Sequence, residues 1–524
     1  MINNAVKQPQ TAKYLPQIVE DYKGNPLIEA LPPVYLHGEA ARLMAFDPGY
    51  NEAERELDAQ YRAHSVWRLF RYFQPLVAHL DIEQRISMAI RQGYISRNPV
   101  TPNYAARLAQ GADAVRNNSQ HLSDYYTGNA TSVGFTVIGL SGVGKTTGIQ
   151  RVLSMYPQTI QHTQYNGESL YLNQLVWAKL DCPFDGAIKG LCFDFFAYVD
   201  RVLGTDYSRK FSVSRMTVDA ALPRMAQVAN AHCLGLIVID EIQHLSQAKS
   251  GGQAKMLNFF VTLVNNVGVP VVLIGTTKAM SILQSEFRQA RRSSAQGALI
   301  WDRLQNDQSW EIMLRAMWKY QWLRKPTPLT DDLKNILYEE SQGILDIAVK
   351  LYAMAQSKAI ADGVETITPK TIREVVGEML HLVKPMLKAL RDGDAKKLAQ
   401  YEDIRLLDVD AYITAQIARI PGTAEDSAND EIRSLEEQAI VKLLEMDIPS
   451  KIARYSVRKI IRQASAGQPL SVVVKKAFKI ALNMESDNEG TDEAKQTGDL
   501  RDMAKDSAYD NLKNTGATAV ADEF

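Results

Sequence analysis

Four short apolar runs, separated by long helical stretches, constrain the fold more than any other feature of this 524-residue sequence. The runs are VGFTVIG (133–139), LVWAKLD (175–181), LGLIVID (234–240) and VPVVLIG (269–275), and ALIWD (298–302) is a possible fifth. Parallel strands need long connections, and strands buried on both faces are almost continuously apolar. The sequence therefore predicts an α/β fold with a five-stranded parallel sheet covered by helices on both faces.

The flanking segments have different patterns. Pro32 and Pro33 exclude a helix at their position, so the start of the chain is expected to be an extended arm. Residues 67–100 have helical periodicity with a stop at Gly93, and residues 307–391 are helical with a break at Gly343. The predicted order is an extended arm (1–60), a helical segment (61–130), the core (131–305), a helical lid (306–392), a mostly helical extension (393–483) and an acidic, disordered tail (484–524).

Charge is distributed unevenly along the chain. The tail at 484–524 has 11 acids and 4 bases, which leaves 49 acids and 55 bases in residues 1–483. No acid interrupts the stretch 450–479, whose bases are Lys451, Arg454, Arg458, Lys459, Arg462, Lys475, Lys476 and Lys479. This stretch is expected to bind a protein partner or DNA, or to be a solvated helical surface.

Two classes of protein are excluded by simple counts. The chain has neither an apolar signal-peptide core nor a run of 18 apolar residues, so we expect a soluble cytoplasmic protein without a membrane partner. Its three cysteines have no CxxC or Cys/His spacing, so neither a disulfide framework nor a zinc site is expected. Buried free thiols are expected instead.

A glycine-rich octet, GLSGVGKT (139–146), follows the first apolar run and precedes a helical stretch. In this GxxxxGK[ST] pattern, backbone N–H groups surround phosphates, Lys145 reaches the β and γ oxygens, and the Thr146 hydroxyl ligates Mg²⁺. We therefore predict ATP and Mg²⁺ as cofactors. The predicted nucleotide-binding residues are Gly139, Ser141, Gly142, Val143, Gly144, Lys145, Thr146 and Thr147.

Two adjacent carboxylates, Asp240 and Glu241, end the third apolar run. The carboxyl end of a strand beside the phosphate loop lies close to the phosphates, so Asp240 is predicted to hold Mg²⁺ together with Thr146. Two adjacent carboxylates would repel each other without a cation. Glu241 is therefore predicted to polarise the attacking water, although the pair could also be a solvated strand end.

Further candidates follow the fourth apolar run. Thr276, or in second place Thr277, is expected to contact the γ-phosphate or the water, whereas His244 is expected to be structural. The cluster around Arg288 and Arg291 is either a solvated face or the source of an arginine finger for a neighbouring subunit.

In this order, the phosphate loop, the paired acids, the threonine-ended strand, the arginine cluster and the helical lid resemble AAA+ ATPases. More closely, the chain resembles the TnsC family, the ATP-dependent regulators of heteromeric bacterial transposition. The matching segments span roughly residues 20–390 and are NPLIEALPP, RISMAIRQGYISRNP, DCPFDGAIKGLCFDFF, CLGLIVIDEIQHLS and MLNFFVTLVNNVGVPVVLIGTTKA.

The resemblance implies a bacterial protein that oligomerises with ATP as a ring or helical filament on double-stranded DNA. It implies that the protein receives a target-selector protein, activates transposase subunits and uses ATP hydrolysis to control disassembly. It also implies backbone contacts to DNA from Lys189 and Thr205, with Arg209 and Lys210 as further candidates. Many AAA+ lids carry an arginine after the glycine of a sensor helix, whereas this chain has Asp346 and then Lys350.

Two other functions share the same core. A helicase loader or initiator would need a DNA-reading winged helix, for which only residues 446–482 are available. A nucleotide-switched signalling scaffold would oligomerise without binding DNA, so salt-sensitive DNA retention would exclude it.

Overall fold

The computed structural model describes residues 9–116, 134–211, 217–247, 252–280, 297–380, 383–393, 409–419 and parts of 439–486. The chain divides into two compact units, residues 1–420 and 421–524.

The predicted parallel sheet is present in the first unit and has five strands in the order β5-β6-β7-β2-β8. Every neighbouring pair is parallel. The strands are β2 (Phe135–Gly139), β5 (Trp177–Asp181), β6 (Leu236–Asp240), β7 (Val271–Gly275) and β8 (Ala298–Trp301). The possible fifth strand is therefore real, and it lies at the edge next to β2.

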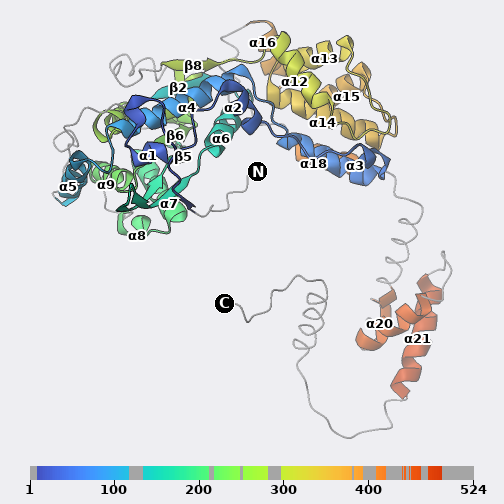
Figure 1. Ribbon diagram of the computed structural model, residues 1–524. Helices are drawn as coiled ribbons and strands as arrows, with labels where there is room; N and C mark the ends of the chain where they lie inside the picture. The colour runs from blue at the N-terminus through green and yellow to red at the C-terminus, as the bar shows by residue number, and fades with distance from the viewer. Residues whose placement is uncertain are drawn as a thin grey trace. The chain divides into compact units, whose positions relative to one another are not determined.

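Alternating side chains of the central strands enter two different cores. In β6, Leu236 and Val238 belong to one buried cluster, and Ile237 and Ile239 belong to the other. The first cluster contains residues of α4 (Val77–Ile95) and α6 (Lys145–Ser154). The second contains residues of α7 (Ile188–Leu203), α9 (Val218–Ala231) and α10 (Gly252–Thr262). Helices thus cover both faces of the sheet, as predicted (Figure 1).

The segment before the core forms a helix that continues past the expected stop. Helix α4 runs through Gly93 to Ile95, so the prediction that Gly93 ends the helix is wrong. A Cβ at Gly93 would lie 2.7 Å from Pro270, which precedes β7. The glycine is needed there because another element packs closely against the helix. Helix α5 (Pro102–Arg116) follows, and Tyr104 donates a hydrogen bond to the Asn230 carbonyl at the end of α9.

The N-terminal arm is extended only in part, which corrects the expectation. Short helices α1 (Pro26–Glu29) and α2 (His37–Met44) lie on either side of Pro32 and Pro33, and Leu27 and Ile28 are fully buried.

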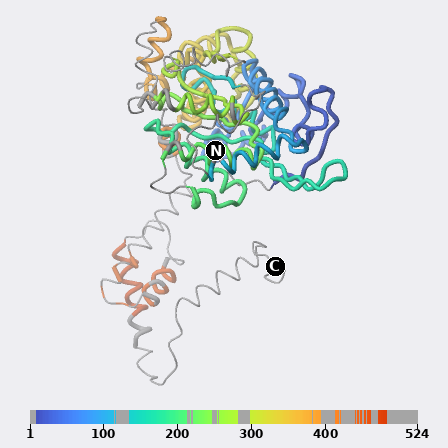
Figure 2. Tube along the Cα trace, turned by 90° about the vertical axis from the view of Figure 1, so that its left-hand side faces the viewer, coloured from blue at the N-terminus to red at the C-terminus, as the bar shows by residue number. Residues whose placement is uncertain are grey.

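A second sheet, which the sequence analysis missed, involves the start of the arm. Strand β1 (Gln10–Thr11) pairs with β3 (Thr159–Tyr165), which forms a hairpin with β4 (Glu168–Leu175). In Figure 2 the hairpin is the teal segment beside the dark blue arm. The arm therefore completes a sheet of its own chain.

The region predicted as a lid is helical. Its helices are α12 (Gln308–Trp318), α13 (Asp331–Ser341), α14 (Leu345–Ala361), α15 (Pro369–Met379) and α16 (Lys384–Arg391), and α18 (Val409–Arg419) packs on α14. Gly343 breaks the helices as expected, with a φ of 75°. The Thr368 hydroxyl caps α15 by accepting from the Thr371 N–H.

The second unit contains two described helices, α20 (Ser450–Ile461) and α21 (Leu470–Ser486). They pack around a small core that includes Ala453, Val457, Val473 and Ala477. The exposed bases of these helices include Arg458, Lys459, Lys475, Lys476 and Lys479. Residues 487–524, most of the predicted acidic tail, lie outside the described residues.

The three cysteines are free and buried, as predicted. Among the described residues, no helix combines the length and the apolar character that crossing a bilayer requires.

A buried ion pair joins the N-terminal segment to the lid region. Arg62 of α3 (Ala59–Val66) donates to both carboxylate oxygens of Glu365, at 2.7 and 2.6 Å, and to the Trp322 carbonyl at 3.0 Å. The Arg62 side chain is 1% exposed and that of Glu365 13% exposed. Burial opposes ionisation of Glu365, but the hydrogen bonds from Arg62 and the Arg324 N–H outweigh it and lower its pKa.

We predict that Arg62→Met lowers the unfolding free energy by about 3 kcal/mol, because it leaves the Glu365 charge buried without its partner. Arg315→Met, which removes the exposed ion pair to Glu311, is the control and should cost less than about 1 kcal/mol. Denaturant titrations followed by tryptophan fluorescence would measure both. The ion pair contributes fully above pH 4.5, the usual pKa of a glutamate. Because the folded-state pKa of Glu365 is lower than that value, the effect of Arg62→Met should shrink as the pH falls from 4.5 through the folded-state pKa. Equal effects of the two variants would contradict the assignment.

Candidate functional site

The octet 139–146 forms the loop between β2 and α6, as the sequence pattern predicts. Gly142 has a φ of 79° and Gly144 a φ of 98°, and Gly144 is the N-cap of α6. Both conformations favour glycine because a side chain would be strained there. A loop of this kind and the first turn of a helix present unpaired N–H groups, which is an arrangement suited to anions.

Gly139 has a different reason to be glycine. A Cβ at this position would lie 1.9 Å from the carbonyl oxygen of Trp301, at the end of β8. The residue therefore permits close pairing of β2 with the edge strand. Its contact with nucleotide stays a prediction.

The Lys145 ammonium lies inside the loop. It donates to the carbonyl oxygens of Gly139 at 2.8 Å and Leu140 at 2.6 Å, and the residue is 8% exposed. These carbonyls hold the ammonium within the curve of the loop, where it could bind an anion.

Thr146 and Asp240 meet although they are 94 residues apart in the chain. The Thr146 hydroxyl donates to Asp240 Oδ2 at 2.9 Å, and the Glu241 N–H donates to Oδ1 at 2.9 Å. Asp240 is 3% exposed. Mg²⁺ in proteins is held by a few oxygen ligands together with waters and substrate phosphates, so this hydroxyl and carboxylate fit that cation. The described residues contain no cluster of three or more His, Cys, Asp or Glu able to hold a metal alone.

Glu241 follows in a left-handed conformation, with a φ of 57°, which is uncommon for a residue with a side chain. The Gln243 side-chain amide donates to Glu241 Oε2, and its Oε1 accepts from the Thr276 N–H at 3.1 Å. Gln243 thus connects the end of β6 to the end of β7. The His244 Nδ1–H donates to the Cys182 carbonyl at 2.9 Å, as a structural residue would.

Thr276 lies at the end of β7 and is 7% exposed. Its hydroxyl is buried and has no hydrogen-bond partner among the described residues. Unpaired buried hydroxyls are costly, so this group is a candidate to acquire a partner when the site changes.

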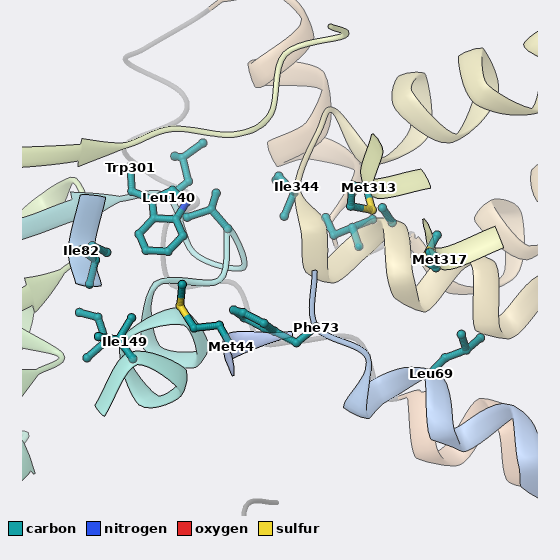
Figure 3. Close-up of a cluster of buried hydrophobic side chains, with 14 of the residues drawn as sticks. Met44, Leu69, Phe73, Ile82, Leu140, Ile149, Trp301, Met313, Met317 and Ile344 are labelled. Atoms are coloured by element: carbon teal, nitrogen blue, oxygen red, sulfur yellow. The ribbon is translucent and has the colours of Figure 1, made fainter. Parts of the chain in front are cut away.

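A cavity of about 160 Å³, which the sequence analysis did not anticipate, adjoins the loop. Its walls are mostly apolar and come from the N-terminal segment, the loop and the lid region: Leu69, Phe70, Tyr72, Phe73, Gln74, His79, Gly142, Gly144, Thr147, Met313, Leu345, Asp346, Val349 and Lys350. Figure 3 shows Phe73, Leu140, Ile344 and Met313 in this part of the molecule. The bulky run WRLFRYF at 67–73 was the signal in the sequence.

The lid region reaches the loop directly. The Asp346 N–H donates to the Gly142 carbonyl at 3.1 Å. Lys350 forms an ion pair with Asp346, with Nζ 2.6 Å from Oδ2, and both residues line the cavity. Lys350, the first base after Gly343, is therefore near the loop.

The predicted DNA-binding residues lie on and after α7, apart from the loop in sequence. Lys189 is partly exposed in the first turn of α7, with its ammonium 5.4 Å from the Phe193 ring centre. The Thr205 hydroxyl donates to Asp200 Oδ1 at 2.6 Å. Arg209 and Lys210, exposed in α8 (Tyr207–Phe211), both pair with Asp206, at 2.8 and 2.7 Å. Arg288 and Arg291 lie outside the described residues.

A family model and several solved structures match parts of this chain. Residues 133–283 match the family model described as "AAA domain". The chain is similar to the Orc1 protein of Aeropyrum pernix solved in complex with DNA (14% identity, 61% of this chain, 83% of that chain, TM-score 0.34). It is also similar to Cdc6p of Pyrobaculum aerophilum (12%, 74%, 96%, 0.34) and to the RuvB branch migration motor of Thermotoga maritima (14%, 53%, 68%, 0.29). No curated protein matches the chain.

The parallel sheet, the glycine loop and the carboxylates at the end of β6 define a P-loop AAA+ fold, with helices making up most of the remainder. Within it, residues 133–283 form an AAA-family ATPase domain.

Gly144→Ala should lower stability by about 1–2 kcal/mol and weaken the binding of tripolyphosphate, because the loop must change its backbone to relieve strain. Gly204→Ala is the matched control, since Gly204 also has a positive φ of 69° but lies at the end of α7, and no atom of the described residues lies within 4 Å of its Cβ position. It should lower stability without changing anion binding. Thermal unfolding and calorimetric titration would measure the two effects, and unchanged binding in Gly144→Ala would refute the loop's role.

Proposed function

We propose that this chain is an ATP- and Mg²⁺-dependent ATPase that assembles on double-stranded DNA and regulates DNA transposition. The observation that supports the ATPase activity most strongly is the 2.9 Å contact between Thr146 and Asp240 beside the glycine loop. The transposition role is supported by the resemblance of residues 20–390 to the TnsC family. In this role the protein would connect a target selector to the transposase in the bacterial cytoplasm.

Different residues of the site would bind different parts of Mg²⁺-ATP. Loop N–H groups and Lys145 would hold the phosphates, while the aromatic and apolar walls of the cavity would accept the base. Thr146 and Asp240 would hold Mg²⁺, which when bound neutralises charge on the phosphates. The hydrogen bond from the Asp346 N–H to the Gly142 carbonyl would couple a change in the loop to the lid region.

Hydrolysis would depend on Glu241 and its neighbours. Glu241 would orient and polarise the attacking water, and the bond from Gln243 would fix its position relative to Thr276. The cluster with Arg288 and Arg291 would supply a finger to the ATP of the next subunit, which makes hydrolysis depend on assembly. Hydrolysis would then control disassembly.

DNA would be held through its backbone. Lys189 and Thr205, with Arg209 and Lys210, offer ammonium, guanidinium and hydroxyl groups that suit phosphate oxygens. The pairs of Arg209 and Lys210 with Asp206 are exposed and therefore weak enough to exchange for phosphate. The exposed bases of α20 and α21 would serve the extension's contacts with transposase subunits.

Two substitutions separate binding from hydrolysis. Lys145→Ala should abolish the binding of a fluorescent ATP analogue, because it removes the cation within the loop. Glu241→Gln should leave binding within about twofold but reduce hydrolysis by about 100-fold or more, as expected for loss of a general base. Equilibrium fluorescence and phosphate release would measure the two steps. Wild-type rates in Glu241→Gln would exclude its proposed role.

A second experiment tests assembly on DNA. Negative-stain images with duplex DNA and a non-hydrolysable ATP analogue should show rings or filaments that are lost in Lys145→Ala and Lys189→Ala. Binding should weaken as salt increases, with little dependence on sequence. Lys334→Met, a lysine substitution in the lid region, is the control and should assemble normally. Nucleotide-dependent oligomers that ignore DNA at low salt would favour a signalling scaffold instead.

A further inference from the structure

A lysine occupies the metal-binding side of the site. Lys179 lies on β5, next to β6, and its ammonium is 3.0 Å from Asp240 Oδ2 and 3.1 Å from Asp181 Oδ1. The Lys179 side chain is 15% exposed and that of Asp240 4% exposed, whereas the Asp181 side chain is 73% exposed. Lys179 therefore joins a buried carboxylate to an exposed one.

Both oxygens of Asp240 are engaged in this arrangement. Oδ1 accepts from the Glu241 N–H, while Oδ2 accepts from the Thr146 hydroxyl and from Lys179. The ammonium thus contacts the same oxygen as the hydroxyl that would share a cation with it. Two cations cannot occupy one carboxylate oxygen without strong repulsion in a partly buried site.

We infer that Lys179 is a built-in counter-ion of the metal-binding carboxylate, which neutralises Asp240 in the empty site and moves to Asp181 when the site is filled. This inference rests on the proposed ATPase function. An unpaired carboxylate as buried as Asp240 would be costly, so the lysine stabilises the empty site. The exposed Asp181 already lies within contact distance, so the ammonium needs only a small movement to leave Oδ2.

The consequence is a site that disfavours a divalent cation unless phosphates arrive with it. Lys179 lowers the affinity of the site for a divalent cation, because Asp240 must exchange one positive partner for another. Asp181 raises that affinity, because it offers the Lys179 ammonium a second partner. The two residues should therefore change metal affinity in opposite directions when each is substituted.

Metal binding can be measured without turnover. Mn²⁺ is titrated into the full-length protein loaded with a non-hydrolysable ATP analogue, and bound Mn²⁺ is followed by electron paramagnetic resonance. Lys179→Met should tighten Mn²⁺ binding by about tenfold, as expected when a unit charge beside a divalent cation is removed. Asp181→Asn should weaken it, and should do so less in the Lys179→Met background, because Asp181 acts partly through Lys179.

Lys334→Met is the matched control. The Lys334 side chain is 18% exposed and pairs with Glu311 and Asp331 at 3.1 and 2.9 Å, but it lies on α13 in the lid region. Its substitution should leave Mn²⁺ affinity unchanged. Any loss of folding in Lys179→Met would be detected by circular dichroism, and Lys179→Gln then provides a second uncharged variant.

Three results would overturn the inference or its basis, and they are distinguishable. Unchanged Mn²⁺ affinity in both uncharged variants would show that Lys179 does not compete with the cation. Weaker binding of the analogue in Lys179→Met without metal would identify Lys179 as a phosphate ligand. A wild-type protein that binds no analogue at any Mn²⁺ concentration would instead contradict the proposed function.

Discussion

The arrangement of the site depends on one carboxylate that is buried at the end of a strand. Asp240 follows four fully buried residues of β6, and it is 3% exposed. A hydroxyl from α6, a backbone N–H and the ammonium of Lys179 satisfy its oxygens. Because all five strands are parallel, their carboxyl ends meet at one edge, and only there can these groups come from three separate segments. The sheet thus positions the charge, and the surrounding donors make its burial tolerable.

Neighbouring segments connect this edge to distant parts of the first unit. Gly142 of the loop contacts Asp346 at the start of α14, and the cavity wall includes residues from the N-terminal segment. The N-terminal segment is in turn tied to the lid region through Arg62 and Glu365. A change in the loop therefore has direct contacts through which to alter the packing of the lid against the N-terminal segment. Such a change is the physical requirement for nucleotide-controlled assembly, which the proposed function needs.

The strands and the glycine loop could be predicted because their local sequence patterns are strong. Apolar runs such as LGLIVID and the octet around Lys145 allow few alternatives, so the strands and the loop were placed correctly. The errors had two causes, long-range packing and an overlooked local turn signal. Gly93 was taken as a helix stop, but it makes room for Pro270. The hairpin β3–β4 was missed although Asn166-Gly167, with positive φ at both residues, is a strong turn signal. The contact of Lys179 with Asp240 could not be predicted, because it depends on which strands are neighbours.

The most direct test of the account is an electron cryomicroscopy structure of the full-length protein with duplex DNA, Mg²⁺ and a non-hydrolysable ATP analogue. The account predicts phosphates against the N–H groups of residues 142–146, a cation between Thr146 and Asp240, and the base in the cavity lined by Phe73 and Val349. It also predicts that Lys189 faces the DNA backbone within a ring or filament. Nucleotide bound elsewhere, or DNA held on a surface away from α7 and α8, would contradict it.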